Sequence, residues 1–193
     1  MEPQLIAERA AWNRLLLALP APHLLQSWEW GAVKGQTGWA AHRLAWPRPG
    51  QAAPVAAQHG LGLAYHNHWW EFQMVEGRLA FDVMLEHLDP AVGFEIDTYW
   101  VQTAGHDPAA VVQRLGDRAP LLHIKDGPAT ADAPMVAVGQ GALDFPAIVA
   151  AASGARWLIV ELDRCATDMT EAVRKSYAYL VKEGLARGNK HAS

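Results

Sequence analysis

The sequence between residues 60 and 163 contains four apolar runs that each end in polar side chains: GLGLAYHNH (60–68), VGFEID (92–97), LLHIKD (121–126) and WLIVELD (157–163). Short apolar runs bounded by polar residues are typical of buried β-strands. The sequence therefore predicts strands at Leu61–His66, Val92–Asp97, Leu121–Lys125 and Trp157–Glu161. Met135–Val138 is a further, shorter candidate strand.

Helical patterns separate these strands. Residues Leu79–Leu88 place apolar side chains on one helical face, and a Pro at the first position favours a helix that starts at Asp107-Pro108. Two further helices are predicted at Asp144–Ala152 and Thr167–Leu185. Strands that alternate with helices at this spacing indicate parallel βαβ units, so we expect an α/β fold with four consecutive units.

The first fifty residues differ in texture. Residues 3–18 follow a helical pattern that Pro20 and Pro22 end, and five of the nine tryptophans fall before residue 50. His42–Trp46 is a candidate strand, and Gln51–Ala57 resembles the tail of a helix. We expect this region to form a helical, Trp-rich appendage to the α/β part.

Composition excludes several classes of protein. The 193 residues carry a net charge of −4, so no basic field favours nucleic acid. The single cysteine, Cys165, excludes an internal disulfide framework and favours a reducing, cytoplasmic location. No stretch approaches the roughly 20 apolar residues of a membrane span, so neither membrane nor nucleic acid is an expected partner.

The polar strand ends predict a site. The carboxyl ends of parallel strands carry the functional loops of α/β folds, and side chains two residues apart share one face of a strand. Four pairs share a face in this way: His66 with His68, Glu95 with Asp97, His123 with Lys125, and Glu161 with Asp163. If these faces point inward, imidazoles and carboxylates meet at one rim. Such ligands favour Mn²⁺, Fe²⁺, Co²⁺ or Zn²⁺ over Ca²⁺, and an open position on the ion would bind a substrate hydroxyl and carbonyl.

Five motifs occur in an order that resembles one family: GLGLAYHNHWWEF, VGFEIDTYW, LLHIKD, VGQGALDF and WLIVELDRC. Residues 55–193 resemble the C-terminal half of the sugar phosphate isomerase/epimerase superfamily, the xylose isomerase-like TIM barrels that include inosose dehydratase-like enzymes. The resemblance implies a divalent metal (Mn, Co, Mg, Fe or Zn) at the rim of the barrel. It also implies proton transfer next to the carbonyl of a small-molecule sugar or polyol.

The same resemblance suggests roles for individual residues. The implied metal ligands are His66, Asp97, His123 and Glu161, with His68 as the rival of His66. Lys125 resembles the lysine beside the substrate oxygen. Glu71 is either the acid/base group or a turn anchor, and His68 and Glu161 are the other candidate bases.

Other polar and aromatic residues near the rim have plainer interpretations. Asp163 and Arg164 could pair with each other, and Glu95 fits a polar residue of the barrel interior better than a catalyst. Trp69, Trp70 and Trp100 could stack on a sugar or pack against the helices.

The predicted architecture is half of a TIM barrel. A whole barrel takes about 250 residues, whereas residues 55–193 suffice for about four units. The first predicted strand and the last would each have an unpaired edge, which invites pairing with another chain. Residues 1–50 cover these edges, or a second copy completes the barrel as a homo-oligomer, or the protein is poorly soluble.

Residues 11–46, with LQSWEWG at 25–31, resemble the start of FemAB-type peptidyltransferases, so residues 1–50 are expected to be a separate FemAB-like fragment. Three functions therefore compete. The first is a metal-dependent isomerase, epimerase or dehydratase. The second is a catalytically impaired barrel remnant that binds metal or sugar, and the third is a peptidoglycan-related acyltransferase.

Overall fold

The computed structural model describes residues 4–17, 44–45, 56–57 and 60–188, and the chain forms two compact units, residues 1–59 and 60–193. In the first unit, strand β1 (Gln4–Leu5) pairs antiparallel with β2 (Leu44–Ala45), and helix α1 spans Arg9–Leu17. The helix predicted from residue 3 thus starts too early, because Gln4 and Leu5 pair with a strand. Most of the Trp-rich segment and of the predicted helix tail at 51–57 lies outside the described residues.

The second unit contains the predicted parallel sheet. Its strands are β3 (Leu63–His66), β6 (Val92–Asp97), β7 (Leu121–Ile124) and β8 (Trp157–Val160). They lie in the order β3-β6-β7-β8, and every neighbouring pair is parallel. The α/β prediction is therefore confirmed, and the sheet is that of a partial TIM barrel. The segment 135–138 forms only isolated bridges, at Met135 and Val136, instead of a strand.

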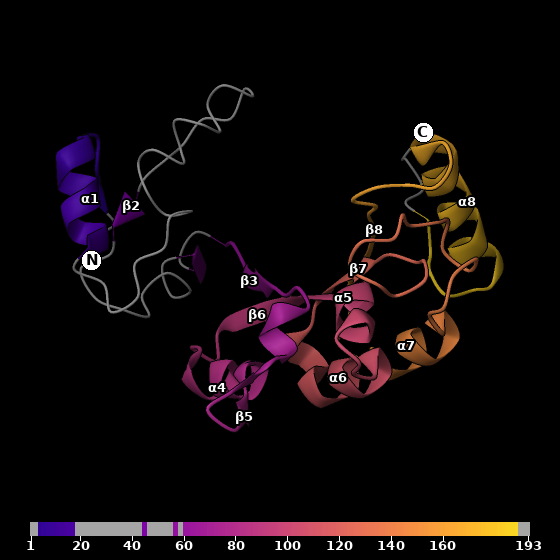
Figure 1. The fold of residues 1–193 in the computed structure, drawn as a ribbon, viewed down its shortest axis with the longest axis horizontal. Coiled ribbons are helices and arrows are strands. Elements are labelled where there is room, and N and C mark those ends of the chain that lie inside the picture. The colour runs from indigo at the N-terminus through magenta and orange to yellow at the C-terminus, as the bar shows by residue number, and fades with distance from the viewer. Residues whose placement is uncertain (1–3, 18–43, 46–55, 58–59, 189–193) are drawn as a thin grey trace. The chain divides into compact units, whose positions relative to one another are not determined.

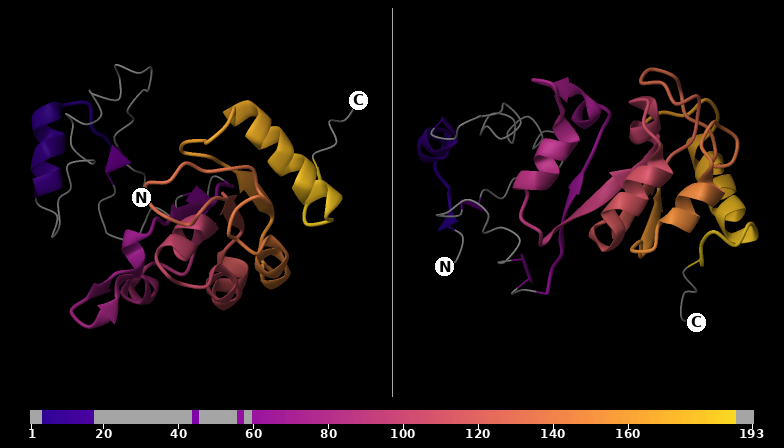
Figure 2. Two further views of the ribbon diagram at one scale, coloured as in Figure 1. Left: turned by 45° about the vertical axis from the view of Figure 1, so that its right-hand side comes forward. Right: turned by 90° about the horizontal axis from the view of Figure 1, so that it is seen from below.

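Helices follow the strands. They are α4 (Ala80–His87), α5 (Thr98–Thr103), α6 (Pro108–Leu115), α7 (Phe145–Ala151) and α8 (Met169–Lys182), with short 3-10 turns at Trp70–Phe72 and Gly116–Arg118. A small hairpin, β4 (Met74–Val75) and β5 (Arg78–Leu79), precedes α4. Helices α4, α6 and α7 follow one another along one side of the sheet (Figures 1 and 2). Among the described residues, no helix is long and apolar enough to cross a bilayer.

Alternation along the two inner strands separates a core from a polar face. Phe94 and Ile96 on β6, and Leu122 and Ile124 on β7, are fully buried in the main hydrophobic cluster, which also includes residues of α4, α6 and α7. The residues between them point to the opposite face of the sheet, because successive side chains alternate. That opposite face carries Glu95 and His123. Because the apolar face must be buried, the register of the two strands is fixed.

Aspartates start four of the helices. Asp97, Asp107, Asp144 and Asp168 each accept a hydrogen bond from a backbone N–H in the first turn of α5, α6, α7 and α8. These caps satisfy amide donors that have no partner inside the helix. The starts of α6 and α7 agree with the sequence prediction, whereas α5 was not predicted and begins directly at the end of β6.

The loop that follows β7 is held in place by hydrogen bonds to the side chain of Asp126. The fully buried Asp126 accepts backbone N–H bonds from Gly127, Gly139 and Gly141, at 2.8, 2.9 and 2.9 Å. A Cβ on Gly141 would lie 2.1 Å from Oδ1 of Asp126, so only glycine fits there. This loop is thereby fixed beside the carboxyl end of the sheet.

Candidate metal centre

Register brings the predicted rim residues together. His66 on β3 lies opposite Glu95 on β6, and Asp97 at the end of β6 lies opposite His123 on β7. Glu161 follows β8 directly, and its N–H bonds to the carbonyl of Ile124, so it continues the pairing of β8 with β7. The ends of the four strands thus place His66, Asp97, His123 and Glu161 at one edge of the sheet.

Asp97 lies at the centre of the group and is fully buried. Its Oδ1 accepts the N–H of Trp100, which is the cap of α5, so only Oδ2 is directed toward the other rim residues. Oδ2 lies 3.0 Å from Nζ of Lys125, 3.8 Å from Nε2 of His66 and 3.9 Å from Nδ1 of His123. Burial raises the pKa of Asp97 to about 6, although Lys125 opposes that shift.

Asn67 joins the ends of β3 and β6. Its side-chain oxygen accepts the N–H of Asp97 at 2.9 Å, and its amide group donates to the carbonyl of Asp97 at 3.3 Å. Asn67 is fully buried, and in the sequence it lies between His66 and His68 of the HNH motif. This role of Asn67 was not predicted from the sequence, although its position inside the HNH motif was the available signal.

Asp97, His123 and Glu161 form a group that could hold a metal ion. Their ligand atoms lie within 4.8 Å of one another. Nδ1 of His123 is 2.6 Å from Oε2 of Glu161. Asp97 Oδ2 and Glu161 Oε2 also face Nζ of Lys125, at 3.0 and 2.8 Å. Two carboxylate oxygens and a ring nitrogen that converge around a cation in this way could also hold a metal ion. The donor set of two carboxylates and an imidazole suits a divalent transition metal.

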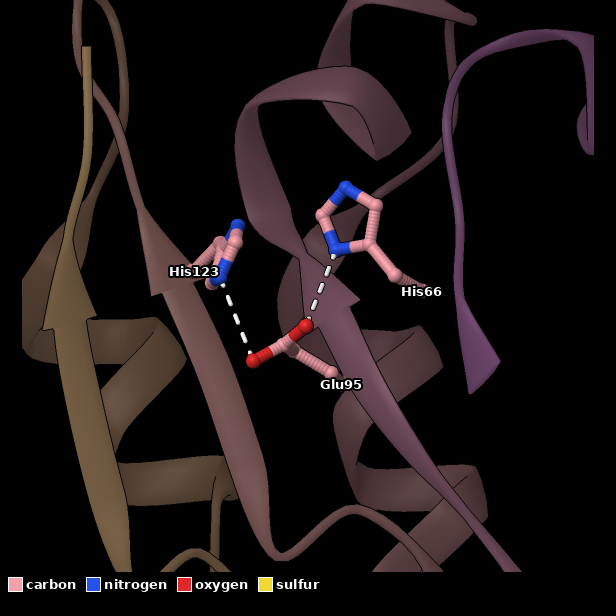
Figure 3. A group of neighbouring side chains, drawn as sticks. All are labelled: His66, Glu95 and His123. Carbon is pink, nitrogen blue, oxygen red and sulfur yellow. Dashed lines mark ion pairs between the residues drawn. The ribbon is translucent and has the colours of Figure 1, made fainter. Parts of the chain in front are cut away.

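Glu95 lies between the two histidines (Figure 3). Its Oε1 is 3.2 Å from Nε2 of His123, and its Oε2 is 3.5 Å from Nδ1 of His66. The two imidazole rings are 4.5 Å apart, centre to centre. His66, Glu95 and His123 also form a second group whose ligand atoms lie within 4.8 Å of one another. Burial, followed by the neighbouring His123, lowers the pKa of His66 to about 4, so this ring is neutral at pH 7.

Lys125 is the positively charged side chain among the carboxylates of the rim. Its ammonium group, 2% exposed, lies 3.0 Å from Asp97, 2.8 Å from Glu161 and 2.9 Å from Asp163. Burial alone would lower the pKa of Lys125, but the three carboxylates outweigh it and raise that pKa. Asp163 therefore pairs with Lys125 and not with Arg164, which donates to the backbone carbonyls of Ala131 and Asp132.

Glu71 is arranged as an anchor of the loop after β3. The hydroxyl of Tyr65 donates to its Oε1 at 2.8 Å, and the backbone N–H of His68 donates to its Oε2 at 2.8 Å. Burial raises the pKa of Tyr65, as does its bond to Glu71. Glu71 is itself buried, and each of its two carboxylate oxygens accepts a hydrogen bond from the chain. This geometry favours the turn-anchor alternative over the acid/base role.

His68 lies on an aromatic surface next to the rim. Its ring stacks on Trp70 at 4.1 Å and 13° between planes, and lies 4.9 Å from the ring of His66. Trp100 is buried, whereas Trp70 is 46% exposed, so only part of the aromatic group faces outward. Burial lowers the pKa of His68, which keeps the ring neutral and able to accept a proton at pH 7.

The chain belongs to the xylose isomerase-like TIM barrel family, whose model matches residues 15–183. Two crystal structures of sugar phosphate isomerase/epimerases from Parabacteroides distasonis are similar to it. One is 29% identical over 72% of this chain with a TM-score of 0.63, and the other is 31% identical over 72% with a TM-score of 0.59. The chain covers 51% and 52% of these two proteins, so it spans about half of their length.

A third structure supports the fold alone. A xylose isomerase domain protein from Alicyclobacillus acidocaldarius is 18% identical, covers 70% of this chain and 54% of its own, and has a TM-score of 0.52. No curated protein matches the chain. The FemAB resemblance has no support in these comparisons, and the range of the barrel family model includes residues 15–46 of that segment.

Proposed function

We propose that the rim of this sheet binds a divalent metal and contributes to an isomerase, epimerase or dehydratase that acts on a sugar or keto-polyol. The observation that carries the proposal is the convergence of Asp97, His123 and Glu161, whose ligand atoms lie within 4.8 Å of one another. His66 is the fourth proposed ligand, through the Nε2 that faces Asp97 at 3.8 Å. Mn, Co, Mg, Fe and Zn are the candidate ions, and the ion would polarise a substrate carbonyl when bound.

We propose a separate role in proton transfer for each of several residues of the chain. Removal of a proton from the carbon next to a carbonyl places negative charge on the carbonyl oxygen. Lys125 is proposed to donate a hydrogen bond to that oxygen. In the apo rim its three N–H groups face three carboxylates. A metal that takes oxygens of Asp97 and Glu161 would leave Lys125 with Asp163 and with free N–H groups for substrate.

His68 is the proposed base. Its neutral ring can take the carbon-bound proton on a ring nitrogen and return it on the same face to the neighbouring carbon, which gives isomerisation. Epimerisation would need a second group to deliver a proton to the opposite face of the same carbon. Glu161 is less suited as a base, because its Oε2, which faces His123 at 2.6 Å, is proposed as a metal ligand. Glu71 is proposed to act indirectly, since its Oε2 holds the backbone of His68.

The test is solvent exchange on the purified 193-residue chain. We expect the Mn²⁺-loaded chain to exchange the carbon-bound hydrogen next to the carbonyl of a keto-sugar with deuterium from D₂O, measured by proton NMR over a panel of substrates. His68→Gln should abolish exchange but retain Mn²⁺ binding. His87→Ala, on the exposed face of α4, is the matched control and should change neither.

Two other outcomes would contradict parts of this proposal. Mn²⁺ binding without exchange on any keto-sugar would favour the impaired remnant, which keeps the ligands without turnover. Absence of both binding and exchange would overturn the metal-dependent function as a whole.

We also propose that a second copy of the chain is the partner that completes the barrel. Within the described residues, β3 and β8 each have a neighbour on one side only. Their first residues are apolar and exposed, with Leu63 at 39% and Trp157 at 56%. A parallel pairing of β3 in one copy with β8 in the other, made twice, would close eight strands and supply the other half of the pocket wall. Light scattering should then give twice the 21.1 kDa chain mass.

A further inference from the structure

We propose that Glu95 is a positioning residue that directs His66 and His123 toward one metal position beside Asp97. This inference rests on the proposed metal site and adds a residue that touches no metal itself. From the sequence, Glu95 shares a strand face with Asp97 and was interpreted as a polar residue of the barrel interior.

The geometry is nearly symmetrical about Glu95. One carboxylate oxygen faces Nε2 of His123 at 3.2 Å, and the other faces Nδ1 of His66 at 3.5 Å. The opposite nitrogens of the two rings, Nδ1 of His123 and Nε2 of His66, lie 3.9 and 3.8 Å from the same atom, Oδ2 of Asp97. In Figure 3 each ring turns one nitrogen toward Glu95 and the other away from it.

This arrangement selects a tautomer for each ring. An ionised carboxylate only accepts hydrogen bonds, and a neutral imidazole has one nitrogen that donates and one that accepts. Glu95 therefore favours a proton on Nδ1 of His66. On His123 it favours a proton on Nε2 once a metal takes Oε2 of Glu161, because without a metal that oxygen lies 2.6 Å from Nδ1 and competes for the ring proton. The lone pairs are then left on the two nitrogens that face Asp97. A metal-ligating histidine usually donates its second ring N–H to such a carboxylate, and here one carboxylate serves two rings.

The contacts of Glu95 suit it to this role more than to metal ligation. Nδ1 of His66, the nitrogen that faces Glu95 at 3.5 Å, has no hydrogen-bond partner, so Glu95 is the nearest carboxylate that can accept a proton from it. Oδ2 of Asp97, Nδ1 of His123 and Oε2 of Glu161 lie around one position, whereas Glu95 approaches His123 from its opposite nitrogen. Glu95 is 24% exposed at its side chain, compared with 0% for Asp97.

A direct-ligand arrangement is the competing outcome, because His66, Glu95 and His123 also lie within ligand reach of one another. The two arrangements use opposite nitrogens. A metal beside Asp97 binds Nε2 of His66 and Nδ1 of His123, whereas a metal held by Glu95 binds Nδ1 of His66 and Nε2 of His123. The identity of the bound nitrogens therefore decides between them.

The experiment uses the full chain with ¹⁵N-labelled histidine and Zn²⁺ as a diamagnetic probe. Long-range proton–nitrogen spectra are recorded with and without Zn²⁺ at pH 8, with His66→Gln and His123→Gln used to assign the signals. We expect the Zn²⁺-induced shifts on Nε2 of His66 and Nδ1 of His123. With Zn²⁺ bound, the ring protons should lie on the two nitrogens that face Glu95. Shifts on the nitrogens facing Glu95 would overturn the proposal in favour of direct ligation.

Glu95→Gln is the decisive variant. Its amide can accept from one ring but must donate to the other, so one imidazole should change tautomer, and Zn²⁺ affinity should fall about 10–100-fold. Glu95→Asp keeps an acceptor-only group and should recover part of the affinity and the original tautomers. Glu183→Gln, at the exposed end of α8, is the control that should change nothing.

The outcomes separate this inference from the proposed function. Wild-type chain that binds no Zn²⁺ contradicts the metal site, and the tautomer of His66 in the metal-free chain then tests Glu95 alone. Zn²⁺ affinity and tautomers that stay unchanged in Glu95→Gln would overturn the role of Glu95 and leave the metal site standing.

Discussion

The inner and outer strands of the sheet hold their parts of the rim in different ways. Strands β6 and β7 have neighbours on both sides, and they contribute Asp97 and His123, whose side chains are 0% and 15% exposed. Strands β3 and β8 have one neighbour each among the described residues, and they contribute His66 and Glu161, at 25% and 40% exposure. The core thus fixes one half of the ligand set, and the other half depends on what pairs with the outer strands.

Stability should show this contrast most strongly. Leu122 is fully buried on β7, so Leu122→Ala leaves a cavity and should lower the free energy of unfolding by about 2–5 kcal/mol. Leu63, on β3, is 39% exposed, and Leu63→Ala should cost less than about 1 kcal/mol. Urea unfolding followed by far-UV circular dichroism compares the two variants. Equal losses would mean that the outer strand is as well packed as the inner one.

Metal affinity should follow the same division. Asp97→Asn removes the buried central ligand and should weaken Mn²⁺ binding by on the order of 100-fold or more, beyond the effect typical of outer-shell groups. Lys125 keeps Glu161 and Asp163 in this variant, so the fold should persist. Glu161→Gln should weaken binding about tenfold, because that side chain is exposed and less fixed. Calorimetric titration measures both, with the exposed Asp117→Asn as control. A larger loss from Glu161→Gln would reverse the ranking of the strands.

The apo rim should also show two opposite pH dependences. The pKa of His66 is about 4 in the fold and 6.5 in model peptides, so the unfolded chain binds the extra proton between these values. This group therefore costs stability as the pH falls from 6.5 to 4. The pKa of Asp97 is about 6 in place of 3.8, so the folded chain binds the extra proton, and this group adds stability as the pH falls from 6 to about 4.

Single variants separate these two contributions. His66→Gln should make the metal-free chain gain stability, relative to wild type, as the pH falls from 6.5 to 4. Asp97→Asn should make it lose stability over the same range, each by on the order of 2 kcal/mol. Urea unfolding in the presence of a chelator at pH 4, 5, 6 and 7 gives the slopes. Slopes of the same sign in both variants would show that burial does not set the charge of the two groups.

The smallest expected effect concerns the outer edges. Trp157→Glu places a charge at the start of β8, where a second copy would pair with β3. We expect self-association about tenfold weaker, with the fold of the chain intact, because charged side chains on an edge strand oppose pairing between chains. Sedimentation equilibrium measures the change, and Met74→Glu, on the exposed β4 of the hairpin, is the matched control. A wild-type chain that is monomeric at every concentration would exclude a second copy as the partner.

The sequence predicted the strands and the rim because both follow from local rules. Alternation along VGFEID places Phe94 and Ile96 on one face of the strand and Glu95 and Asp97 on the other. The parallel arrangement of the strands brings their polar ends to one edge of the sheet. Helix α5 escaped prediction because Thr98, Tyr99 and Val101 are residue types that favour strands, and the cap from Asp97 to Trp100 decides otherwise.

Pairing across strands was harder to predict. Asp163 and Arg164 are neighbours in sequence, but Asp163 reaches Lys125, from the next strand, while Arg164 turns away to backbone carbonyls. The position of Glu95 between two imidazoles likewise depends on the register of three strands at once. No local pattern contains that register, whereas the structure fixes it through β3, β6 and β7.

The proposed metal position is a single one, with ligands from both the inner and the outer strands. The most direct measurement is a crystal structure of the Mn²⁺-loaded chain with diffraction collected at the Mn absorption edge. We predict one anomalous peak about 2.0–2.2 Å from Oδ2 of Asp97, Nδ1 of His123 and a carboxylate oxygen of Glu161, with Nε2 of His66 as the fourth ligand. A peak held by Glu95 between the two histidines, or no peak at the rim, would contradict the account.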